Sequence, residues 1–160
     1  MGRIIAFLIA LAGCLPGGTA LAQAPQNAVD RSIVILPMLA NETEVMAVLA
    51  AARVWPEVAY QVARDPTIRV VDPPVMPREF YEETSAVEAA QELGARYVFM
   101  AFVSGDHVYR FDSVVRDGRT GAVVWGQIFY TDEYAIVGVA GEIGVALRLA
   151  MERFAPQPPN

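Results

Sequence analysis

The fold class is decided by the run Ser32-Ile33-Val34-Ile35-Leu36-Pro37. Its continuous, mostly β-branched apolar side chains are typical of a strand buried on both faces, as the central strand of a sheet with parallel neighbours is. The next residues, Asn41-Glu42-Thr43-Glu44, offer polar caps and first-turn acids to a helix. We therefore predict an α/β domain whose ordered part begins at Arg31.

The predicted helix covers residues 44–64. Its apolar side chains recur with helical spacing and predict a buried face formed by Val45, Val48, Leu49, Ala52 and Trp55. Pro56 lies inside this helix, and a proline removes one backbone hydrogen bond and disfavours helical geometry at the residue before it. We expect a kink or a short break at Trp55. Residues 67–71 predict a second strand, which Asp72-Pro73-Pro74 ends.

The second half of the chain predicts a helix, a three-strand meander and a final helix. Ser85 and Glu88 fit a capping box for a helix that ends at Gly94. Strands are predicted over residues 95–104, 107–116 and 122–130, with turns between them. The last helix is predicted to start at Thr131 or Asp132 and to end at Phe154, with an apolar face of Ile136, Val139, Ile143, Val145, Leu147 and Met151. The predicted order is β-α-β-α-β-β-β-α, with helices packed on one five-stranded mixed sheet in a single domain.

The amino terminus has the pattern of a secretion signal. Arg3 precedes an apolar run of signal-peptide length, which is shorter than the roughly 20 residues that span a bilayer. Ala20-Leu21-Ala22 predicts cleavage before Gln23, which makes residues 1–22 the signal peptide. Residues 23–30 then form a flexible leader, residues 31–154 the domain and residues 155–160 a disordered tail.

A lipobox offers an alternative at the same end of the chain. Leu11-Ala12-Gly13-Cys14 would direct cleavage before Cys14 and leave a lipid-anchored cysteine. Cys14 is the only cysteine in the sequence. Cleavage before Gln23 would remove it, so the mature protein would have no disulfide, thiol nucleophile or cysteine metal ligand. The two alternatives predict a periplasmic protein or an outer-membrane lipoprotein.

The charge pattern excludes two classes of partner. The net charge is −6, every positive side chain is an arginine, and the arginines are scattered singly. Nucleic acids and anionic lipid surfaces need a concentrated basic patch, so we predict no nucleic-acid partner and membrane contact only through a lipid at Cys14.

Catalytic and metal-binding patterns are not recognisable in this sequence. His107 follows a Gly-Asp turn, and its neighbour Asp106 would point to the opposite face of a strand. The turn at residues 117–121 lacks the alternating oxygen ligands of a calcium loop. Glu79, Glu82 and Glu83 form an acidic cluster that fits a solvated segment. We therefore predict no enzymatic activity, no metal and no cofactor.

Two candidate binding regions stand out. Alternation along residues 107–116 puts Tyr109, Phe111, Ser113 and Val115 on one face, and Val108, Arg110, Asp112 and Val114 on the other. One interpretation is a core face backed by a semi-exposed aromatic face, with Arg110 and Asp112 paired to neighbours. The other is an aromatic sheet surface for a protein partner, formed by Tyr109, Phe111, Trp125, Gln127 and Phe129.

The second region follows the first two strands, at the sheet edge where open α/β sheets bind ligands. The loops at residues 37–43 and 71–77 carry Asn41, Thr43 and Asp72. Helix capping also accounts for Asn41 and Thr43.

The ordered series of motifs resembles the TolB amino-terminal-type domain, which is also found in FlgO-like envelope proteins. The resemblance rests on the opening strand with Asn41 and Thr43, on residues 68–71, on the helix-Leu-Gly-strand junction at residues 90–98, and on Thr120-Gly121 with Val124-Trp125. Arg110 and Asp112 depart from it, since the family has small or apolar residues there, and Pro37-Met38 replaces a Pro-Phe pair.

The resemblance implies a non-enzymatic α/β module of envelope assemblies or multidomain sensors, with no catalytic residues. Its partners would be envelope proteins. The hypothesis from the sequence is therefore an envelope protein-interaction module, and the alternative is a small-molecule-binding domain of the sensor type.

Overall fold

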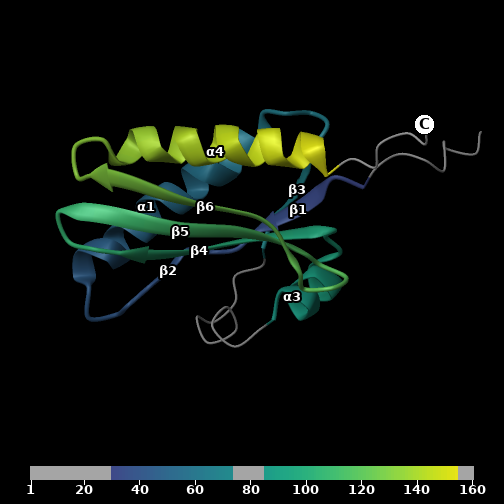
Figure 1. Ribbon diagram of the computed structural model, residues 1–160, viewed down its shortest axis with the longest axis horizontal. Coiled ribbons are helices and arrows are strands. Elements are labelled where there is room, and N and C mark those ends of the chain that lie inside the picture. Colours follow the sequence, from purple (N-terminus) through teal and green to yellow (C-terminus); the bar gives the residue numbers. More distant parts are fainter. Residues whose placement is uncertain (1–29, 74–84, 155–160) are drawn as a thin grey trace, which may run out of the picture.

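A computed structural model describes residues 30–73 and 85–154 of the chain. Within these ranges, three helices pack on one six-stranded mixed sheet (Figure 1). The α/β class and the element order are confirmed, with one short strand added to the five expected. Several predicted features lie outside the described residues: the predicted signal peptide, the lipobox with Cys14, nearly all of the predicted leader, the acidic cluster of Glu79, Glu82 and Glu83, and the predicted tail.

The sheet has the strand order β3-β1-β4-β5-β6. β1 lies between β3 and β4 and is parallel to both, whereas the pairs β4-β5 and β5-β6 are antiparallel. The six strands are β1 (Ser32–Ile35), β2 (Leu39–Ala40), β3 (Arg69–Val71), β4 (Tyr97–Ser104), β5 (Val108–Asp117) and β6 (Val123–Asp132). The three helices are α1 (Val45–Ala63), α3 (Ala86–Leu93) and α4 (Ile136–Arg153).

The added strand β2 continues the line of β1 beside β4. Ile35 pairs with Phe99, and after a short break Ala40 pairs with Val103 further along the same strand. A two-residue strand has no recognisable pattern of its own, because its hydrogen bonds come from β4. From the sequence these residues are therefore expected in a loop.

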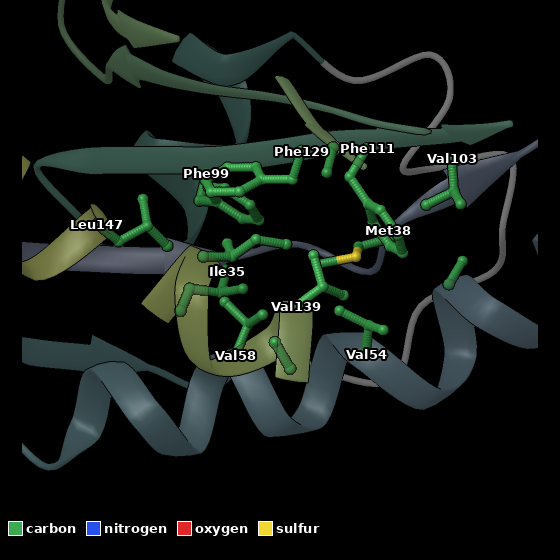
Figure 2. Packing of buried hydrophobic residues seen from close by; sticks show 14 of the residues in the cluster. Ile35, Met38, Val54, Val58, Phe99, Val103, Phe111, Phe129, Val139 and Leu147 are labelled. Carbon is green, nitrogen blue, oxygen red and sulfur yellow. The ribbon is translucent and has the colours of Figure 1, made fainter. Parts of the chain in front are cut away.

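Helices α1 and α4 cover one face of the sheet. Figure 2 shows the inner side chains of the sheet, Phe99, Phe111 and Phe129 among them, packed with Val54 and Val58 of α1 and with Val139 and Leu147 of α4. Of the described elements, only α3 packs on the opposite face, where Ala86, Ala89 and Ala90 lie against β1 and β4. No described helix covers the outer face of β5 and β6, where Ile128 and Tyr130 are exposed.

The buried face of α1 differs from the prediction. Val45 and Leu49 are exposed, and the buried residues are Ala47, Ala50, Ala51, Val54, Val58 and Val62. The physical reason is the close approach of α4, since a methyl group added at Gly144 of α4 would lie 2.5 Å from Cβ of Gln61 in α1. Small side chains on α1 permit this approach. Helical periodicity alone does not show whether the alanine-rich face of α1 or the neighbouring face with Val45 and Leu49 is the buried one.

Of the two alternatives predicted at Trp55, a kink or a short break, the break is wrong, because α1 continues through Pro56 as one helix. Pro56 and Ala52, whose carbonyl loses its helical hydrogen bond, both face solvent, where water can replace the missing donor. The indole Nε1 of Trp55 donates a hydrogen bond to the carbonyl oxygen of Ile35 at 2.9 Å. The helix is thus fixed to the end of β1 at the position where a break was expected.

The three predicted helix starts have different outcomes. The last helix, α4, begins at Ile136 and not at Thr131 or Asp132, because β6 continues to Asp132, which pairs with Val108. The capping box of α3 is confirmed, with Ser85 accepting from the N–H of Glu88 and with Gly94 in the left-handed region after the last turn. For α1, the N-cap is Glu44 and carries no side-chain cap. Asn41 instead accepts hydrogen bonds from the backbone and the hydroxyl of Thr43, so these two residues form a turn ahead of the helix.

Candidate functional site

Three of the five residues of the predicted aromatic surface are buried. Tyr109, Phe111 and Phe129 lie in the core beneath α1 and α4, with at most 6% of each residue exposed. Alternation correctly grouped these side chains on one face of β5 and β6. It did not reveal that both long helices pack on that same face, so the prediction of an exposed aromatic surface at these three positions is corrected.

The other two residues, Trp125 and Gln127, line an open groove at the edge of the domain. The groove has a volume of about 700 Å³ and lies between the inner face of β6 and one side of α4. Trp125 is half-buried and packs near Phe129, with ring centroids 6.4 Å apart, whereas Gln127 is exposed. The α4 side of the groove consists mainly of small and apolar residues, among them Gly138, Gly141, Val145, Ala146 and Leu149.

Strand β6 itself forms one edge of the sheet. Among the described residues, no strand pairs with its outer side, which leaves every second N–H and C=O of the strand directed away from β5. Residues 123–131 contain no charged side chain and no proline. The edge is therefore long, neutral and able to accept another strand.

The outer face of β4, β5 and β6 carries a second group of exposed apolar side chains. Phe102, Ile128 and Tyr130 are 44%, 46% and 62% exposed, and Val124 lies further along β6. Phe102 and Ile128 flank Asp112 in one cross-strand row. Arg110 donates from Nε and Nη2 to Oδ1 of Asp112, at 3.0 and 2.6 Å, so these two residues pair with each other and not with a neighbouring strand.

The sequence analysis missed this outer apolar group. Val124, Ile128 and Tyr130 alternate along β6 as regularly as Trp125, Gln127 and Phe129 do. The signal was therefore present, and the choice between the two faces depended on where the helices pack.

A smaller apolar hollow lies near the start of α1. Met46 and Leu49 of α1 line it together with Tyr134 from the connection between β6 and α4, and its volume is about 360 Å³. Tyr134 is 90% exposed, which makes it the most exposed large apolar residue among those described. No sequence motif marked this hollow.

Asn41 and Asp72, from the two predicted ligand loops, are not brought together, and residues 74–77 of the second loop lie outside the described residues. Asn41 follows Ala40, which pairs with Val103 of β4. Asp72 follows Val71, which is level with Val98 of β4 through its pairing with Val34. Asn41 and Asp72 are therefore separated by about five strand residues, or roughly 16 Å along the strands. The loop at Asn41 instead lies by the β4–β5 turn, where Glu44 Oε2 accepts from the N–H of Gly105 at 2.8 Å.

Asp117, at the end of β5, has several structural partners. Asp117 accepts from Arg96 at 2.5 Å and from the N–H groups of Arg119 and Thr120, which closes the β5–β6 turn. The hydrogen bond from Arg96, together with those two backbone donors, lowers the pKa of Asp117. His107 lies exposed in the β4–β5 turn. Within residues 30–73 and 85–154, no three His, Cys, Asp or Glu side chains lie close enough to hold a metal ion together.

The described part of the chain contains no helix with both the length and the apolar character needed to cross a membrane.

The fold places this domain among small mixed-sheet α/β modules that solved structures already represent. PelC from Paraburkholderia phytofirmans, crystallised as a dodecamer, is 20% identical with a TM-score of 0.53, and the match covers 78% of this chain and 89% of that one. TolB from Acinetobacter baumannii is 13% identical with a TM-score of 0.55, over 76% of this chain and 28% of the TolB chain. Protein XCC0632 from Xanthomonas campestris is 8% identical with a TM-score of 0.56, over 80% of this chain and 91% of that one.

These similarities establish the fold. The expected likeness to TolB is thus found at the level of three-dimensional structure. No protein-family model and no curated protein sequence matches the chain.

Proposed function

We propose that this chain is a non-enzymatic interaction module of the bacterial envelope, which binds a partner protein through the side of the domain formed by β6. The observation that carries the proposal is the concentration of exposed apolar side chains on that side. Ile128 and Tyr130 lie on its outer face, Trp125 lines the groove on its inner face, and the strand between these faces is an open edge. Contiguous apolar surface of this kind marks protein interaction sites in soluble domains.

The location outside the cytoplasm is part of the same proposal. It rests on the secretion signal at residues 1–22 or, alternatively, on lipidation of Cys14. The intact mass of the mature chain distinguishes these alternatives, because two or three acyl chains add several hundred daltons. The fold shared with TolB is compatible with either location.

The proposal is tested by cross-linking in cells that carry the chain with a tag after Asn160. Captured envelope proteins are identified from the native chain and from a variant with Ile128→Ser and Tyr130→Ser. Both side chains are exposed, so the variant keeps its core and its melting temperature within a few degrees. We expect one reproducible partner, at least about tenfold depleted in the variant because the centre of the apolar contact is lost.

A matched control replaces two apolar residues of similar exposure on α1, Val45→Ser and Leu49→Ser, and is expected to retain the partner. Equal recovery from both variants would remove the assignment to β6. Capture of nothing above background from the native chain would refute the interaction function itself.

A further inference from the structure

Between Trp125 and Thr131, the free edge of β6 lacks the devices that normally protect an edge strand. Natural edges carry lysines, prolines, inward-pointing charges or bulges that prevent pairing with another chain. Residues 123–131 have neither a proline nor a charge. The irregularity in the β5–β6 pairing lies near the start of the strand, where Val115 pairs with Trp125 and Arg116 with Val123. From Trp125 to Asp132 the strand is regular and open on its outer side.

The groove beside the edge has room for the side chains of an added strand. Its floor is formed by Trp125, Gln127 and Phe129, which point to the inner face of β6. Its wall on α4 includes Gly138, where a methyl group would meet no atom within 4 Å. A strand hydrogen-bonded to β6 would direct every second side chain into this space and the others onto the outer face beside Ile128.

We infer that the strand that pairs with this edge is β6 of a second copy of the chain, antiparallel to the first about a twofold axis. This inference rests on the proposed function, of which it names one partner. The charge pattern favours a second copy: the chain has a net charge of −6, yet residues 123–131 are neutral, so two such strands meet without like charges opposite one another. An isologous contact of this kind closes on itself and yields a dimer with one continuous sheet.

The side chains select the register of this pairing. Opposed residues must lie on the same face, so the twofold axis passes beside a residue. With Gln127 on the axis, Trp125 lies opposite the second copy's Phe129. This is an aromatic pair of the kind that stabilises antiparallel strands, and the two Gln127 amides can hydrogen-bond to each other. A register centred on Ile128 would place Trp125 against Thr131 and lose both contacts.

Opposite charges introduced at Gln127 test whether the twofold axis passes beside this residue. Gln127→Lys and Gln127→Glu are made in the full chain, and the exported proteins are examined by sedimentation equilibrium. Gln127 is exposed, so both variants are expected to fold, with melting temperatures close to that of the native domain. We expect the native chain to have twice the monomer mass, and each variant alone to associate at least about tenfold more weakly, because two like charges then meet on the axis.

An equimolar mixture of the two variants is expected to recover the dimer, since lysine then faces glutamate. Gln91→Lys, the same change on the exposed side of α3, is the matched control and is expected to dimerise like the native chain. A monomeric native chain at high concentration, persistence of dimers in each variant alone, or a mixture that stays monomeric would each overturn the inference. A monomeric native chain that still captures an envelope protein through Ile128 and Tyr130 would overturn it and leave the proposed function intact.

Discussion

Two serines are buried in the sheet, and only one of them, Ser32, has hydrogen-bond partners for its hydroxyl among the described residues. Ser32 Oγ donates to Asp30 Oδ1 at 2.6 Å and accepts from the N–H of Arg96 at 2.8 Å, and thus joins β1 to the residue before β4. Ser113 is 2% exposed in the middle of β5, and its hydroxyl has no partner among the described residues. A buried hydroxyl without a partner loses its hydration and gains nothing in return.

Replacement of these serines by alanine should therefore change stability in opposite directions. Ser113→Ala is expected to raise the free energy of unfolding by about 0.5–1.5 kcal/mol, and Ser32→Ala to lower it by about 0.5–1.5 kcal/mol because the hydroxyl's hydrogen bonds to Asp30 and from the N–H of Arg96 are lost. Urea denaturation of both variants gives the two values. Destabilisation by Ser113→Ala would show that its hydroxyl has a hydrogen bond after all.

At the scale of elements, the contact between α1 and α4 depends on one glycine. A methyl group at Gly144 would lie 2.5 Å from Cβ of Gln61, whereas one at Gly138, on the same helix, would meet nothing within 4 Å. Gly144 is buried and Gly138 is exposed. The two positions share the helix and its propensities, so they differ chiefly in packing.

We expect Gly144→Ala to destabilise the domain by about 1–3 kcal/mol, because overpacking outweighs the gain in helix propensity. Gly138→Ala is expected to stabilise it by about 0.5–1 kcal/mol through that propensity. Thermal unfolding of both variants, made in the Gln127→Lys background so that association through β6 does not contribute, measures the difference. Equal effects at the two positions would mean that the helices can separate at Gly144 without loss.

The elements that the sequence predicts best are those with local signals. The capping box of α3 lies within four residues, and the strands β4, β5 and β6 are each bounded by turns with glycine or aspartate, so their positions follow from short stretches of chain. The buried face of α1 and the side of the sheet to which Tyr109 and Phe111 point are decided by α4, which is distant in the sequence. For this reason local patterns do not show that Tyr109 and Phe111 are buried, nor that Trp125 and Gln127 of β6 line a groove against α4.

At the scale of the whole molecule, several carboxylates link stability to pH. The N–H and then the hydroxyl of Thr67 lower the pKa of Asp65, and the hydrogen bond from Arg96 lowers that of Asp117. The pKa of an aspartate in the unfolded chain is near 3.8. A carboxylate whose pKa is lower than this in the folded protein stabilises the fold at pH values above about 3.8. That stabilisation is lost as the pH falls through this value towards the lower folded pKa.

We therefore expect the urea midpoint to be independent of these carboxylates between pH 5 and 7, and to fall progressively as the pH drops below about 4.5. Asp117→Asn should lower the midpoint at pH 7 and flatten its dependence on acid pH. Glu152→Gln, an exposed carboxylate near the end of α4, is the control and should leave the acid dependence unchanged. An acid dependence of Asp117→Asn as steep as that of the native chain would show that its ion pair with Arg96 does not contribute.

The position of β1 between β3 and β4 has a consequence for the order in which the chain acquires structure. The chain leaves a ribosome or a translocation channel amino terminus first, and β1 then has neither neighbour: β3 follows after α1, and Arg96, which bonds to Ser32, is 64 residues away. The strands β4, β5 and β6 and the helix α4 are consecutive and close over short turns, so they can assemble by themselves once they emerge. The most buried strand of the domain is thus the first to be made, and its second neighbouring strand becomes available only after β4 has emerged.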